Sequence, residues 1–105
     1  MIVHPADRPV VEWAAEAGFE YRYVREYGLP EPSLCVQLGM TTAYFHAGRL
    51  IHWRADAAAQ YLDQLMFELT SLFGFCRQAG AYPEQRVFLA PGELGALQRP
   101  CNKAG

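Results

Sequence analysis

The chain has 105 residues, of which 51% are hydrophobic and 13% aromatic, a length that suits one compact core and excludes two well-packed domains. Nine basic against eleven acidic residues leave a formal net charge of −2. This balance excludes a polycation that attracts nucleic acid by its net field, and it is too weak for a mimic of DNA. We expect a single domain over residues 1–105, with a flexible tail from about residue 100.

The first expected elements are a short helix and a strand. Asp7 is a candidate N-cap, Pro9 falls in the first turn, and Gly18 ends a helical run of apolar residues. From Phe19 the apolar period changes to two, which predicts a strand that ends before the Gly-Leu-Pro-Glu-Pro-Ser break at 28–33.

The middle of the chain has the pattern of an antiparallel meander. Alternation over 34–38, 42–46 and 49–53 predicts strands joined by tight turns at Gly39–Met40 and Ala47–Gly48. With two-residue turns, the expected core face carries Leu34, Val36, Leu38, Ala43, Phe45, Leu50 and His52. The other face carries Cys35, Gln37, Thr42, Tyr44, His46, Arg49, Ile51 and Trp53. This mixture of aromatic and polar groups is typical of a surface that meets a partner.

One long helix follows the meander. Its apolar residues alternate in steps of four and three, which only a helix places on one stripe: Ala58, Leu62, Leu65, Leu69, Leu72 and Cys76. Further apolar residues widen the stripe: Tyr61, Met66, Phe73 and Phe75. Asp56 is the expected N-cap, and Gly80 with Pro83 ends the helix, so it spans 56–79. An apolar arc this wide needs more cover than one sheet face gives, so the helix is either central to the fold or shared with a partner.

The expected fold is α+β: an antiparallel three- to four-stranded sheet packed against one long helix, with a short N-terminal helix. The expected order is α-β-β-β-α-β, the last strand lying at 86–89, with helical turns at 91–97 as a short C-terminal helix. Double-stranded RNA-binding domains also have the order helix, three strands, helix. They need a lysine-rich start to their last helix, whereas 55–59 is Ala-Asp-Ala-Ala-Ala, so we do not assign the chain to that family.

No targeting or membrane segment is expected. Residues 1–8 lack the basic stretch and apolar run of a secretory signal, and Asp63, Glu68 and Arg77 interrupt the longest apolar segment. The three cysteines have no close pairing, which fits reduced thiols: Cys35, Cys76 and Cys101. We therefore expect a cytoplasmic protein.

Metal and enzyme sites have weak support. His46 and His52 lie across one hairpin but on opposite faces in the expected register, so they share an ion only if a bulge at Gly48 shifts that register. Cys35 and His46 share a face, which is the start of a thiolate site, but no oxyanion donor accompanies them. A small Cys/His enzyme is thus an alternative, and the expectation is no catalytic residue, no metal and no cofactor.

A second alternative is a single-stranded nucleic-acid-binding domain that uses the aromatic sheet face. Tyr44 and Trp53 could stack on bases, with Arg49 nearby. The negative net charge and the carboxylates of Glu20 and Glu26 oppose this interpretation.

Recognition of another protein remains as the leading hypothesis. The residue types that dominate interface energies gather on the predicted sheet, and the expected protein-binding residues are Arg22, Arg25, Tyr44, His46, Arg49, Ile51 and Trp53. We expect a non-enzymatic protein-binding module: a small intracellular inhibitor or adaptor that occludes a site on a larger protein. Phage anti-defence proteins of the anti-CRISPR type, bacterial immunity proteins and antitoxins act in this way. A homodimer through the 56–79 helix is a second use of the apolar surplus.

Overall fold

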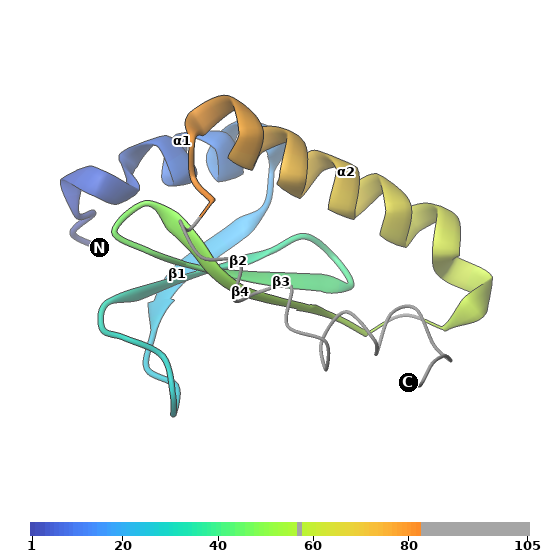
Figure 1. Cartoon of the computed structure of the whole chain (residues 1–105), viewed down its shortest axis with the longest axis horizontal. Helices are drawn as coiled ribbons and strands as arrows, with labels where there is room; N and C mark the ends of the chain where they lie inside the picture. The colour runs from blue at the N-terminus through green and yellow to red at the C-terminus, as the bar shows by residue number, and fades with distance from the viewer. Residues whose placement is uncertain (57, 83–105) are drawn as a thin grey trace.

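A four-stranded antiparallel sheet with two helices on one of its faces makes up the described part of the chain (Figure 1). The computed structural model describes residues 1–56 and 58–82. The strands lie in the order β1-β2-β3-β4, and each neighbouring pair is antiparallel. With η marking a 3₁₀ turn, the elements are η1 (Pro5–Asp7), α1 (Arg8–Ala17), β1 (Glu20–Val24), β2 (Ser33–Gln37), β3 (Thr41–His46), β4 (Arg49–Ala55), η2 (Ala59–Tyr61) and α2 (Leu62–Ala79). The predicted α+β class is confirmed.

The order of elements differs in one respect from the expected α-β-β-β-α-β. Four strands precede the long helix, because the segment after Phe19 pairs with β2 from Glu20 to Val24. Within the described residues the sheet has four strands, the upper end of the expected range. The strand expected at 86–89, the helical turns at 91–97 and the tail from residue 100 lie outside the described residues.

Helix α1 ends where the sequence predicts but begins with a different interaction. Gly18 closes the helix in the left-handed conformation, with φ of 82°, a geometry that glycine adopts without steric cost. Val10 and Ala14 face the core and are fully buried. Asp7 directly precedes the helix, yet its carboxylate makes no capping hydrogen bond, so the predicted N-cap role is wrong.

The inner face of the sheet, which the two helices cover, forms the core. Two rows of paired residues cross the four strands on this face: Tyr23-Leu34-Phe45-Leu50 and Tyr21-Val36-Ala43-Trp53. The buried helix residues packed against them are Val10, Ala14, Leu72 and Cys76. Trp13 of α1 stacks on Phe75 of α2 with ring centroids 4.4 Å apart, so the helices also contact each other.

A β-bulge in β4 exchanges the sheet faces to which the side chains of its second half point, compared with the expected register. Phe45 pairs with Leu50 and Tyr44 pairs with His52, which leaves Ile51 as the extra residue. The bulge turns Trp53 into the core and His52 to the outer face, so the expected placement of these two residues is wrong. The predicted two-residue turn at Ala47–Gly48 is present, and the register shift arises within the strand rather than at the turn.

Two buried carboxylates attach the helices to the hairpin turns. Glu68 of α2 is 2% exposed and accepts hydrogen bonds from Met40 N at 3.1 Å and Thr41 Oγ1 at 2.8 Å, both in the β2–β3 turn region. Asp7, fully buried at the start of α1, accepts from Gly48 N in the β3–β4 turn at 2.8 Å and from Tyr23 OH at 2.6 Å. Each helix thus holds one turn, and the two turns lie at opposite ends of β3.

Close packing accompanies the Glu68 contact. Gly39 adopts φ of 89° in the β2–β3 turn, and a Cβ atom there would overlap Glu68 Oε2. Gln64, one turn earlier on the helix, donates to the same carboxylate at 2.8 Å. Glu68 therefore fixes the height and rotation of the first half of α2 over the sheet.

Helix α2 begins later than predicted. Asp56 is not its N-cap: the backbone N–H of Asp56 bonds to Met40 O at 3.0 Å and prolongs the end of the sheet. Ala58 is extended, and the regular helix starts at Leu62 after one 3₁₀ turn. Gly80 ends the helix in the left-handed conformation, as predicted.

Candidate functional site

The outer face of the sheet, opposite the helices, is centred on Tyr44. Its hydroxyl donates to Glu26 Oε2 at 3.1 Å and accepts from Arg54 Nη2 at 2.9 Å, and the guanidinium carbon lies 5.5 Å from the ring centre. Tyr44 is 1% exposed. The residues that form one row across the four strands are Arg22, Cys35, Tyr44 and His52. Tyr44 was predicted as a surface residue and is instead a buried, hydrogen-bonded part of this network.

The predicted arginine and histidine side chains of the sheet do not converge. Arg22 is exposed on β1 and Arg49 is exposed on β4, the two edge strands, so the width of the sheet separates them. Arg49 Nη1 donates to Tyr82 O at 3.3 Å. His46 is half-buried, with Nδ1 2.8 Å from Pro32 O. These residues therefore form no single binding patch.

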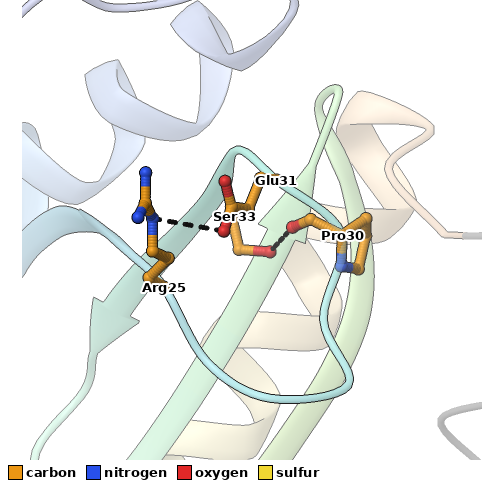
Figure 2. A network of polar contacts seen from close by, with 4 residues as sticks. All are labelled: Arg25, Pro30, Glu31 and Ser33. Atoms are coloured by element: carbon orange, nitrogen blue, oxygen red, sulfur yellow. Dashed lines mark hydrogen bonds and ion pairs between the residues drawn. The ribbon is translucent and has the colours of Figure 1, made fainter.

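Arg25 lies in the loop between β1 and β2, where it pairs with Glu31 (Figure 2). The two atoms, Arg25 Nε and Glu31 Oε2, are 3.2 Å apart, and the side chains are 84% and 56% exposed. Ser33 donates to Pro30 O in the same loop. A groove of about 420 Å³ beside this loop is lined by His4, Tyr23, Val24, Arg25, Glu31 and Pro32. An exposed ion pair of this kind contributes little to stability or to binding.

The two apolar residues predicted for the sheet surface are largely covered. Trp53 is in the core at 3% exposure, and Ile51, the bulge residue, is half-buried. The hypothesis of a single-stranded nucleic-acid site depends on Tyr44 and Trp53 as stacking platforms. Both rings are buried, so neither offers a face to a base in this structure.

The bulge also changes the geometry at the histidines. His52 now lies on the same sheet face as His46, so the expectation that they point to opposite faces is wrong. In the described residues, however, no group of three or more His, Cys, Asp or Glu side chains is placed to hold a metal ion.

Cys35 is poorly suited to act as a nucleophile. It pairs with Tyr44 rather than with His46, and it is 4% exposed. Burial raises the pKa of the Cys35 thiol above its usual value, although the positive charge of Arg22 opposes the rise. A cysteine that stays neutral at physiological pH is a weak nucleophile, and this arrangement gives no support to a Cys/His enzyme.

Alkaline pH should destabilise the fold. Burial raises the pKa of Cys76 from 9.0 to about 12, and burial together with the hydrogen bond to Asp7 raises that of Tyr23 above 10.0. At a pH above the usual pKa of these groups, the unfolded chain releases a proton that the folded chain retains. The free energy of unfolding is therefore highest below about pH 9 and declines as pH rises toward the pKa values of the folded state. Urea unfolding followed by circular dichroism should show a midpoint that falls between about pH 9 and 11.

A matched variant isolates the thiol contribution to this pH dependence. Cys76→Ala removes the titrating group, so its midpoint should decline less steeply over the same range than that of the wild type. Equal slopes for the two proteins would show that Cys76 does not contribute.

An apolar patch at the start of α2 is exposed, and its residues were not among the expected protein-binding residues. We define the α2 patch as Tyr61, Leu62, Met66 and Phe67, which are 51%, 53%, 59% and 64% exposed. Leu62 and Met66 share one side of the helix, and Phe67 lies on the next side. Aromatic residues and methionine are enriched at protein interfaces, and exposure of several within two helical turns is uncommon on a monomer surface. The wide apolar arc indicated such a surplus, but which residues remain uncovered depends on how α2 lies over the sheet.

The way in which α2 packs on the sheet explains why the residues of the α2 patch are exposed. The second half of the helix is packed through Leu72 and Cys76, both fully buried, whereas the first half contacts the rest of the protein mainly through Leu65 and Glu68. Asp63 is the only charged residue between positions 61 and 67. A partner that covers the patch would therefore need to strip water from few charged groups.

None of the described helices is both long enough and apolar enough to cross a membrane. Comparison with models of known families, with characterised proteins and with solved structures finds no match to this chain.

Proposed function

We propose that this protein is a non-enzymatic protein-binding module whose binding surface is the α2 patch. In this proposal it is a cytoplasmic inhibitor or adaptor that occludes a site on a larger protein, of the anti-defence, immunity or antitoxin type found in phages and bacteria. The observation that carries the proposal is the exposure of four large apolar side chains, each more than half accessible, on one short stretch of helix.

The chemistry of the patch supports this use. Tyr61 and Phe67 provide aromatic anchors, and Met66 provides an adaptable thioether. Side chains of these types fill pockets on a partner. Glu68 is buried beside them and fixes the helix to the β2–β3 turn. The patch is thereby presented on a rigid element, which lowers the entropy lost on binding.

Free thiols support the cytoplasmic assignment. Cys35 and Cys76 are both buried, and they form no disulfide within residues 1–56 and 58–82. Proteins of oxidising compartments usually pair their cysteines, whereas reduced buried thiols are typical of cytosolic chains.

Substituting the patch should abolish capture of the partner. We expect Met66→Gln with Phe67→Gln to lower recovery of a bound protein at least about tenfold, because loss of hot-spot side chains costs about 2 kcal/mol or more. Glutamine retains high helix propensity, so the fold should be unchanged by circular dichroism. The measurement is quantitative mass spectrometry of proteins that co-purify with the tagged chain from its source cells.

The control variant removes the arginines of the original sheet hypothesis. Arg22→Gln with Arg49→Gln should leave capture intact, because both side chains lie on strands of the sheet, β1 and β4, and not on α2. If this variant loses the partner while the patch variant keeps it, the binding surface is the sheet and the proposal is wrong.

A further inference from the structure

We propose that one partner of the α2 patch is a second copy of this chain, bound by antiparallel pairing of the two α2 helices about Thr70. This inference rests on the proposed function, because it uses the Leu62 and Met66 side of the same patch. It deepens that function by naming the chemistry of one partner and the orientation in which it binds.

A second apolar stripe runs along α2 beside the buried one. Leu62, Met66, Leu69 and Phe73 follow each other in steps of four, three and four, which places them on one face of the helix. Leu62 and Met66 are more than half exposed, whereas Leu69 and Phe73 are half-buried and pack against the core, Phe73 on Trp53 with ring centroids 5.6 Å apart. Such spacing allows two helices to pack side by side at a small crossing angle, with the side chains of one between those of the other.

The charges beside this stripe are self-complementary. Asp63 and Arg77 are exposed, and they lie seven residues before and after Thr70, so all three share one flank of the helix. Neither Asp63 nor Arg77 has an ion-pair partner among residues 1–56 and 58–82. An antiparallel pair with its two-fold axis at Thr70 would place each Asp63 beside the second copy's Arg77.

The charges also select the orientation. Two-fold parallel pairing would set Asp63 next to Asp63 and Arg77 next to Arg77, which is unfavourable. Antiparallel pairing converts both contacts into attraction. Phe67 lies on a different side of α2 from Leu62 and Met66, so it stays accessible to a larger protein in the paired state.

Sedimentation equilibrium of the purified full chain, from about 5 to about 500 µM, should show a reversible monomer–dimer equilibrium, because one helix face per chain is a small interface. Leu62→Gln with Met66→Gln should raise the dimer dissociation constant at least about 30-fold through loss of the apolar contact. Asp63→Arg alone and Arg77→Asp alone should each raise it about tenfold, because each creates two like-charge contacts per dimer.

The charge exchange is the decisive variant. Asp63→Arg combined with Arg77→Asp restores both attractions, so its dissociation constant should return to within about threefold of the wild-type value. In a Cys101→Ser background, Thr70→Cys should be joined to its own copy by a short bis-maleimide, whereas the control Glu16→Cys on α1 should not.

A wild-type chain that is monomeric throughout this range would overturn the inference. So would a dimer that the exchanged pair fails to restore, since the helices would then meet in another orientation. The capture experiment keeps the two proposals apart: a monomeric protein whose partner is lost on substitution of Met66 and Phe67 retains the proposed function and lacks only the self-pairing.

Discussion

Replacing Trp53 with alanine should lower the free energy of unfolding by about 3–5 kcal/mol, the usual effect of truncating a large buried aromatic side chain. The indole is 3% exposed, is paired across the strands with Ala43 and packs edge-to-face on Phe73 of α2, with ring centroids 5.6 Å apart. Truncation leaves a cavity between β4 and α2 that neither element can close alone. Urea unfolding followed by circular dichroism measures the loss without relying on indole fluorescence.

A conservative variant separates packing from hydrogen bonding at this position. Trp53 Nε1 has no hydrogen-bond partner among the described residues, so Trp53→Phe removes no bond and should cost about 1–2 kcal/mol. If Trp53→Ala instead changes stability by less than about 0.5 kcal/mol, the side chain is on the surface, where strict alternation would place it.

Glu68→Ala should destabilise the protein by about 3 kcal/mol, because buried donors that lose a charged acceptor bear the cost of desolvation without compensation. The donors are Met40 N and the Thr41 hydroxyl in the β2–β3 turn. We also expect faster hydrogen exchange at the Met40 amide, whose protection depends on this carboxylate. Both effects can be measured on one sample by urea unfolding and by exchange followed by NMR.

An exposed carboxylate on the same helix provides the matched control. Asp63→Ala, measured at a concentration at which the chain is monomeric, should change the free energy of unfolding by less than about 0.5 kcal/mol, since Asp63 has no described partner within one chain. Gly39→Ala should be harmful like Glu68→Ala, because its Cβ overlaps the Glu68 carboxylate. Equal stabilities for Glu68→Ala and Asp63→Ala would show that the contact with the turn contributes nothing.

Local chemistry explains which parts of the fold could be predicted. Gly18 and Gly80 end their helices, and Ala47–Gly48 forms a two-residue turn, because these conformations depend on the residue itself and its immediate neighbours. The bulge at Ile51 has no such local signal. The bulge forms if the Trp53 indole packs better in the core, against α2, than it would on the outer face of the sheet. The outcome of that comparison is a property of the assembled core.

The roles of the acidic residues were beyond sequence reasoning for a similar reason. Asp7 was expected to cap a helix, and Glu68 looked like an ordinary member of an amphipathic helix, yet their partners in the turns lie 41 and 28 positions away in the chain. The candidate site was predicted in part. The surplus of apolar surface on the long helix is present as the α2 patch. The expected positions of the sheet residues relied on a register that the bulge breaks. Arg22 and Arg49 lie at opposite edges of the sheet.

The attachment of both hairpin turns to distant carboxylates bears on how the protein assembles. The turn at Gly48 is complete only when the chain start has docked, and the turn at Met40 is complete only when α2 has docked. Neither hairpin is thus a self-sufficient folding unit, and the meander gains its full cooperativity from segments on either side of it. A fragment that contains only the four strands would leave two amides without acceptors, one at each end of β3.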